Sequence, residues 1–196
     1  MKMFLLRVML VWAFVFGAFG FAQDRTRFEQ FGDAFRFLPL YVMVVSVAIE
    51  DYKGAGELAL GTLTTQVAVE GIKKGLEALH DNGNEVKFAK RPCCDSWQGM
   101  PSGHAAGAFS AAGFVYYRYG WKPAIPVGIL AVATAASRVE AKKHSILQVS
   151  AGALIAWGFS WVFTHEYMPK DTMITPSVDV DREGNPQVSL NLLYRF

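Results

Sequence analysis

The sequence predicts an all-α integral membrane bundle of about six helices, followed by a short C-terminal β-hairpin. Apolar residues make up 52% of the 196 residues and charged residues only 18%, which is a low share for a soluble domain. The apolar residues also collect into long blocks, as membrane helices require. The end of the chain instead alternates apolar and polar residues, as strands do. The length fits one domain.

Residues 1–22 begin with Lys2 and Arg7 and then run apolar. This is the pattern of a signal peptide or of a first membrane helix, and the small residues before Gln23 favour cleavage. In both cases the segment directs the chain to the membrane and places Gln23 outside the cytoplasm. Residues 23–34 are polar and charged, and they predict a short helix on the membrane surface.

Five further segments have the composition of helices in a membrane bundle. Several carry the Gly, Ala, Ser and Thr residues that let helices pack closely in a membrane. The segments are residues 35–49, 57–79, 102–119, 123–138 and 144–163. With residues 1–22 they make about six helices, and residues 23–165 are expected to form one membrane domain.

Residues 171–196 have a different pattern. Val178 and Val180 precede a turn sequence at residues 181–186, and every second residue is then apolar as far as Phe196. This alternation predicts a β-hairpin. Because one hairpin cannot close a barrel, we expect the hairpin to pack on another surface rather than to form part of an outer-membrane barrel.

A long loop precedes the 102–119 helix and carries groups that bind anions. Arg91 offers a planar fork of donors suited to phosphate. The sequence Pro101-Ser102-Gly103-His104 predicts a turn that opens a helix, with Ser102 at the N-cap and Gly103 removing side-chain bulk. The free N–H groups of such a helix start, together with the helix dipole, favour an anion.

A second cluster follows downstream, where Ser137 and Arg138 precede His144 by a short turn. His104 and His144 can both exchange protons near neutral pH. Since neighbouring helices run antiparallel, the two clusters are expected at the same side of the membrane. Together they would form a phosphate site with acid–base chemistry attached.

These motifs resemble those of the type 2 phosphatidic acid phosphatase (PAP2) superfamily. The family pattern is a Lys, then Arg-Pro, then Pro-Ser-Gly-His, then Ser-Arg, five residues, His, three residues and Asp. This chain matches it at Arg91-Pro92, at residues 101–104, and at Ser137-Arg138 followed by His144. The resemblance covers roughly residues 37–163.

The resemblance implies a phosphoric monoester hydrolase that needs no metal and no cofactor. His144 is expected to attack phosphorus and form a phospho-histidine, and His104 is expected to protonate the leaving alcohol and then activate water. The residues expected to bind the phosphate are Lys73, Arg91, Ser102, Gly103 and Arg138.

The family Lys usually stands seven residues before the Arg, where this chain has Asn84. Lys73 is the preferred candidate because it follows an apolar helical run, as the family Lys does. Lys74 would point about a quarter turn away. Lys87 and Lys90 are nearer in sequence but lie in the loop.

The family Asp, which orients the nucleophilic His, falls at Gln148. A Gln carbonyl can accept the same N–H group but carries no charge. Another carboxylate such as Glu140 could serve instead, and slower turnover or loss of activity are the other consequences. If the missing charge slows the enzyme, Gln148→Asp is expected to raise kcat about fivefold.

The preferred function is therefore a membrane phosphatase acting on a lipid phosphate, and the chain looks like the lipid A phosphatase branch. Undecaprenyl pyrophosphate and phosphatidylglycerophosphate are alternative substrates. A vanadium haloperoxidase shares the phosphate cradle, but those enzymes are generally soluble. The alternative of another class is an inactive PAP2-like protein that binds lipid.

The expected location is a bacterial inner membrane, with several spans and a site that faces the periplasm. The net charge of +2 and the absence of a Lys/Arg-rich run argue against nucleic-acid binding. Cys93 and Cys94 are adjacent, and neighbouring cysteines seldom form a structural disulfide. No metal-ligand cluster is evident, and nothing in the sequence indicates the oligomeric state.

Overall fold

The computed structural model describes residues 26–168, 172–180 and 186–194. Residues 1–22, predicted to be a signal peptide or a first helix, lie outside the described residues, and so does most of the predicted hairpin turn. The chain forms two compact units, Met1–Glu166 and Tyr167–Phe196.

The first unit begins with two helices joined by a bend of 49°. The first, α2 (Arg27–Phe35), is capped by Thr26, whose hydroxyl accepts the N–H group of Glu29 at 3.1 Å. The second, α3 (Leu38–Ala48), has a Pro in its first turn. They correspond to the predicted surface helix and to the short apolar block that follows it.

Helix α4 (Tyr52–Asp81) is longer than predicted at both ends. Asp51 caps its start by accepting a hydrogen bond from the N–H group of Gly54 at 2.9 Å. Residues 52–56, which were expected to lie between two helices, therefore form the first turns of α4. Lys73 was expected at the end of this helix, but α4 continues to Asp81. The loop that follows contains one short 3-10 helix, η1 (Lys87–Ala89).

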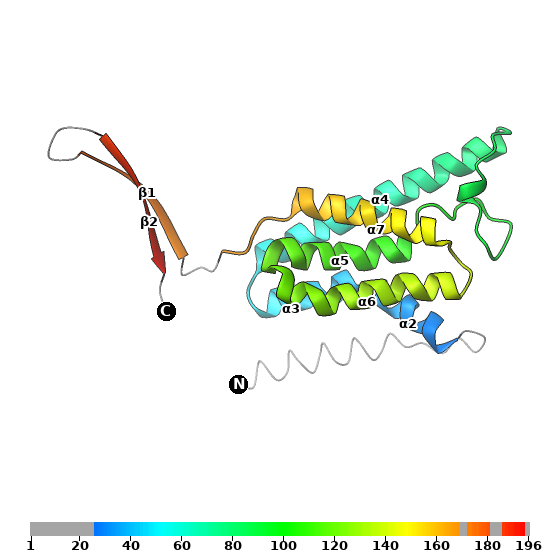
Figure 1. The fold of residues 1–196 in the computed structure, drawn as a ribbon, viewed down its shortest axis with the longest axis horizontal. Coiled ribbons are helices and arrows are strands. Elements are labelled where there is room, and N and C mark those ends of the chain that lie inside the picture. The colour runs from blue at the N-terminus through cyan, green and yellow to red at the C-terminus, as the bar shows by residue number, and fades with distance from the viewer. Residues whose placement is uncertain (1–25, 169–171, 181–185, 195–196) are drawn as a thin grey trace. The chain divides into compact units, whose positions relative to one another are not determined.

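The three remaining helices are α5 (Gly103–Tyr119), α6 (Trp121–Glu140) and α7 (Ile146–Phe163). Helix α5 is the central one and packs against α3, α4, α6 and α7 (Figure 1). Ser145 caps α7 in a capping box with Gln148. His144 therefore precedes this helix, whereas the sequence predicted that it would start it.

Small residues fill the centre of this bundle and large apolar residues cover its outside. Ala106 and Ala111 are 0% exposed, whereas Val67 and Leu154 are each 73% exposed. Helices in a membrane pack through small residues because apolar side chains gain nothing by leaving lipid. The distribution of residues is therefore typical of a membrane bundle.

By length and hydropathy alone, α7 is the helix in the described part of the chain that could cross a membrane, and α2 with α3 passes the same test as a bent pair. By this test the described helices provide one span, or two with the bent pair, which is fewer than the several spans that the sequence predicts.

A buried ion pair ties the bundle together at the start of α4. The guanidinium of Arg118 donates to the carboxylate of Asp51, and their side chains are 5% and 3% exposed. The hydroxyl of Tyr119 also donates to Asp51 at 2.7 Å, and Arg118 donates to the carbonyl of His165 at 2.9 Å. The α3–α4 turn, the end of α5 and the chain after α7 are thereby joined.

The second unit contains two antiparallel strands, β1 (Thr172–Val180) and β2 (Pro186–Tyr194). Val178 lies opposite Val188 in the register. The pairing agrees with the hairpin that the alternating pattern predicts.

Candidate active site

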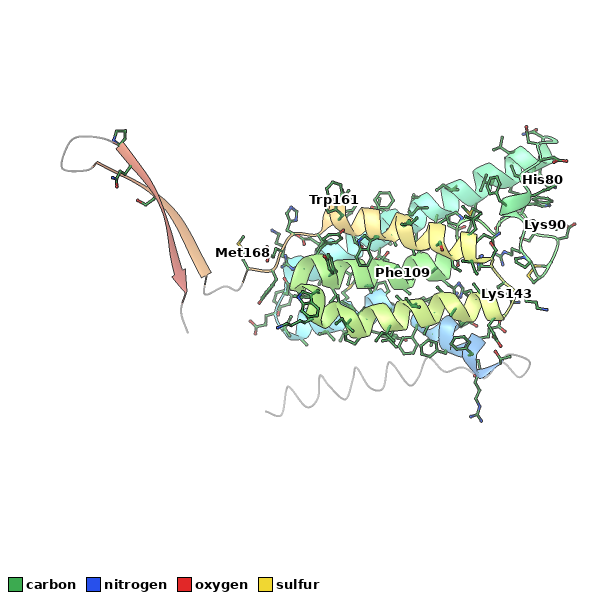
Figure 2. All side chains as sticks on the ribbon, in the orientation of Figure 1. His80, Lys90, Phe109, Lys143, Trp161 and Met168 are labelled. Carbon is green, nitrogen blue, oxygen red and sulfur yellow. A yellow bond between two sulfur atoms is a disulfide. The ribbon has the colours of Figure 1, made fainter. Side chains whose placement is uncertain are left out.

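A cavity of about 850 Å³ lies between α2, α3, α4 and the first turns of α5, and it is closed at one end by Arg91 of the α4–α5 loop and by the turn between α6 and α7. Lys143 and Lys90 mark this end of the bundle, whereas Trp161 lies toward the other end (Figure 2). Its wall includes six residues predicted from the sequence: Lys73, Arg91, Gly103, His104, Arg138 and His144. The two other predicted residues do not line the cavity themselves. Ser102 directly precedes Gly103, and the side chain of Gln148 contacts His144.

Ser102 occupies the N-cap position of α5 with an extended backbone, as predicted. Its hydroxyl, however, makes no capping bond, and this fully buried oxygen has no hydrogen-bond partner in the described part of the chain. The N–H group of Ser102 donates instead to the carbonyl of Gln148 at 2.9 Å. A buried hydroxyl without a partner is costly, and Ser102 directly precedes Gly103 and His104, which line the cavity.

Arg91 provides a second buried polar atom without a hydrogen-bond partner. Its Nε atom is buried and has no partner among the residues that the structure describes. Its Nη2 atom makes one long contact of 3.5 Å with the carbonyl of Gln98. The guanidinium therefore keeps donors for an anion in the cavity.

Lys73 lies close to the start of α5. A Cβ atom added to Gly103 would stand 3.4 Å from the Nζ atom of Lys73, so the ammonium group faces the helix N-terminus. This Nζ atom also contacts the carboxylate of Glu70 at 2.6 Å.

The three alternative lysines are exposed to solvent, and none of them lines the cavity. Lys87 pairs with Glu85 and Lys90 pairs with Asp95, while Lys74 is exposed on α4. The geometry therefore favours Lys73 as the cation that the family pattern requires.

His144 is held by two oxygen acceptors on one of its nitrogens. Its Nδ1 atom lies 2.9 Å from the carbonyl of Gly99 and 3.2 Å from Oε1 of Gln148. Since both partners accept, Nδ1 carries the proton of the neutral ring, and Nε2 keeps a lone pair.

The charge state of this ring follows from its surroundings. Burial, together with the positive charge of Arg91, lowers the pKa of His144 from its usual 6.5 to about 4. The bonds to Gly99 and Gln148 oppose this shift only in part. At neutral pH the ring is uncharged, as a nitrogen nucleophile must be.

Gln148 makes hydrogen bonds at both ends of its amide. Oε1 accepts from His144 and from the N–H group of Ser145 at 3.1 Å, while Nε2 donates to the carbonyls of Phe88 and Lys90, both at 2.9 Å. The side chain thus connects the histidine to the loop that carries Arg91. Glu140, the alternative carboxylate, is exposed at the end of α6.

Asp33 is a site residue that the sequence analysis did not identify. Its Oδ1 atom lies 2.9 Å from Nε2 of His104 and 2.9 Å from Nη1 of Arg138. The detectable signal is a carboxylate on the packed side of an amphipathic helix, one residue after the buried Gly32. A charge in that position needs a partner.

The cavity combines positive charge, a neutral imidazole and backbone N–H groups at a helix start. These are the groups that stabilise the equatorial oxygens of a transferring phosphoryl group. Within the described ranges, no three His, Cys, Asp or Glu side chains are placed to hold a metal ion. The arrangement can bind a phosphoryl group and supply a nitrogen nucleophile and a proton donor.

Cys93 and Cys94 are joined as a disulfide between neighbours. Such a pairing between neighbouring cysteines is rare. Both cysteines are exposed in the loop, and neither lines the cavity.

Comparisons with known proteins agree with the geometry. The sequence profile described as the PAP2 superfamily matches residues 56–171. The chain is also 55% identical over 168 residues to a protein of Helicobacter pylori (strain J99) named lipid A 4'-phosphatase, and the match covers 86% of this chain and 85% of that protein. No solved structure matches the chain.

Proposed function

Because this chain belongs to the PAP2 superfamily and is a helical membrane phosphatase, we propose that it removes a phosphate from lipid A. Its similarity to a protein named lipid A 4'-phosphatase supports this choice of lipid. The observation that carries the mechanism is the hydrogen bonding of His144, which leaves one ring nitrogen unprotonated at a cavity whose lining includes five Lys and Arg side chains.

In the first step, the phosphate binds among Lys73, Arg91 and Arg138. The unpartnered oxygen of Ser102 and the free N–H groups at the start of α5 provide neutral contacts to the same oxygens. These positive charges and dipoles are fixed before the reaction, so they stabilise the charge that develops on the phosphoryl oxygens.

In the second step, Nε2 of His144 attacks phosphorus in line with the leaving oxygen. The P–N bond forms as the bond to the sugar oxygen breaks, and His104 gives its proton to that oxygen. The carbonyls of Gly99 and Gln148 stabilise the ring of His144, which carries a positive charge in the phospho-histidine.

The phosphoenzyme is then hydrolysed. His104, now neutral, takes a proton from water, and the water oxygen attacks phosphorus as the P–N bond breaks. Inorganic phosphate leaves, and both histidines return to their starting protonation states. Atoms and protons balance without any further reactant.

We place the enzyme in a bacterial inner membrane with its cavity toward the periplasm. Asp33 of α2 lines the cavity and accepts a hydrogen bond from Arg138 of α6, so α2 lies at the same end as the site. If residues 1–22 export the chain as their pattern predicts, the cavity lies on the outer side.

The test is phosphate release by the purified full chain in detergent. The panel contains lipid A, undecaprenyl pyrophosphate, phosphatidylglycerophosphate and phosphatidic acid, each with wild type and His144→Ala. We expect the highest kcat/KM with lipid A and background rates with the variant, with the same melting temperature. A higher kcat/KM with another lipid would replace lipid A as the substrate. No release from any lipid would indicate a binding protein.

A further inference from the structure

Asp33 lies outside the segment that matches the family profile, yet it contacts two residues of the family motifs. The profile covers residues 56–171, and Asp33 belongs to α2. Its Oδ1 atom is 2.9 Å from both His104 Nε2 and Arg138 Nη1. The side chains of Asp33 and His104 are 26% and 23% exposed, while that of Arg138 is 4% exposed.

Helix α2 is held against the end of α6, so the position of Asp33 is fixed. A Cβ atom added to Gly32 would stand 1.8 Å from the hydroxyl of Ser137, which means that only glycine fits this contact. Nη2 of Arg138 donates to the backbone carbonyl of Glu29. Asp33, one residue after Gly32, is therefore presented to the cavity by packed backbone.

The contact decides which nitrogen of His104 can reach a substrate. A carboxylate only accepts hydrogen bonds, so Nε2 of His104 carries the proton that Asp33 accepts. The Nδ1 atom has no hydrogen-bond partner among the described residues, and the ring lines the cavity. Nδ1 is thus the nitrogen that can exchange a proton with a bound ester.

The carboxylate also offsets unfavourable charge around this ring. Burial of the ring, together with the positive charges of Arg138 and Arg36, opposes a positive charge on His104, whereas its hydrogen bond to Asp33 favours that charge. A general acid must hold its proton until the leaving oxygen takes it. Asp33 provides a hydrogen-bonded negative charge that partly offsets the effects opposing the protonated ring.

We propose that Asp33 is the positioning residue of the general acid, holding His104 through Nε2 so that Nδ1 donates the proton to the leaving oxygen. This inference rests on the proposed function, since it assigns a role within the same reaction. As the P–O bond breaks and the bond to His144 forms, one proton moves from Nδ1 to the alkoxide. The remaining N–H group stays bonded to the carboxylate.

The leaving group provides the test, because an alkoxide needs a proton whereas 4-nitrophenolate does not. Wild type, Asp33→Asn and Asp33→Glu are assayed as full chains in detergent with a long-chain alkyl phosphate and with 4-nitrophenyl phosphate. We expect Asp33→Asn to lower kcat for the alkyl ester at least about tenfold. Its kcat for the nitrophenyl ester and both KM values should change less than about threefold, and Asp33→Glu should recover part of the loss.

Glu29→Gln is the matched control, because Glu29 also lies on α2 and lines the cavity, and its carboxylate lies 4.0 Å from the ammonium group of Lys143. This variant should keep the wild-type ratio of the two kcat values. Equal losses with both esters in Asp33→Asn would show that Asp33 only holds α2 in place. Faster turnover or a lower KM would show that its carboxylate competes with phosphate, and either result would overturn the proposal.

The proposed function can fail separately. If wild type releases phosphate from neither ester nor from any lipid, the phosphatase assignment is wrong. If wild type is active and the ratio in Asp33→Asn is unchanged, only the role of Asp33 is wrong.

Discussion

The ring of His144 sits where a positive charge is unfavourable, since it is 5% exposed and close to Arg91. With a pKa of about 4, it is expected to stay neutral from pH 7 down to about pH 5. The measurement is the NMR titration of the ring resonance in protein labelled at histidine. His144→Ala identifies that resonance by its loss.

The same lowered pKa makes the free energy of unfolding depend on pH. The unfolded ring binds a proton near pH 6.5, whereas the folded ring binds it near pH 4. The stability provided by the neutral ring is therefore complete above pH 6.5 and is lost as the pH falls toward 4. A titration midpoint for His144 at or above 6.5 would contradict both statements.

Gln148→Asp is now expected to impair the enzyme, in contrast to the rise in kcat that the sequence alone suggests. The two carbonyls of Phe88 and Lys90 would lose their amide donor, at about 1–3 kcal/mol for each buried group left unpaired. We expect kcat/KM to fall at least about tenfold and the melting temperature to fall with it.

Two variants accompany this measurement. Gln148→Glu keeps the side-chain length and the acceptor of His144 but removes the donor, and it should be impaired as well. Glu140→Gln changes an exposed group and should be silent. Faster turnover in Gln148→Asp would mean that the charge matters more than the anchoring of the loop.

At the scale of elements, the backbone of Gly99 connects two parts of the loop between α4 and α5 and joins that loop to His144. Its N–H group donates to the carbonyl of Ala89 at 2.8 Å, and its carbonyl accepts from His144. An added Cβ atom would stand 2.6 Å from the oxygen of Ala89 and 2.7 Å from Nε2 of Gln148. No side chain fits without moving backbone.

Gly99→Ala is therefore expected to displace the acceptor of His144 and to lower kcat at least about tenfold. Gly71→Ala is the matched control, because a Cβ atom there meets nothing within 4 Å and alanine favours the helix. Kinetics and thermal unfolding of both variants measure the effect. Normal kcat in Gly99→Ala would show that the loop adapts.

The helices and the motif residues could be predicted from the sequence, because apolar blocks and short spacings are local signals. Arg91, His104, Arg138 and His144 meet at one cavity, as their order suggested. For Asp33 the helical pattern signals only a carboxylate that needs a partner, and the partner could not be predicted because Arg138 lies on a helix more than 100 residues later.

Two further features of the site could not be predicted from the sequence. The acceptor at Gly99 is a backbone carbonyl, which every residue has. The free hydroxyl of Ser102 looked like a helix cap, and only the surrounding packing shows that it makes no such bond.

At the scale of the whole molecule, the proposed orientation can be tested with a native cysteine. The chain contains two cysteines, so Cys93→Ser leaves Cys94 as a single thiol, exposed in the loop of the cavity. A membrane-impermeant maleimide should label it in intact spheroplasts.

The control places a cysteine at Tyr52, which is 61% exposed at the start of α4, in a chain where both native cysteines are serine. It lies at the opposite end of this 30-residue helix and should react only after lysis. The reverse pattern would place the cavity in the cytoplasm.

The length of α4 has a consequence for how this enzyme meets its substrate. Its 30 residues span about 45 Å, whereas the hydrocarbon core of a bilayer is about 30 Å thick. Lys73 stands 21 residues after Tyr52, or about 32 Å along the axis, which is the depth at which lipid headgroups begin. A lipid phosphate can then reach the cavity by diffusing sideways, without its acyl chains entering water. The rate depends on how crowded the substrate is in the plane of the bilayer or micelle, so adding detergent at constant lipid slows the enzyme by dilution in two dimensions.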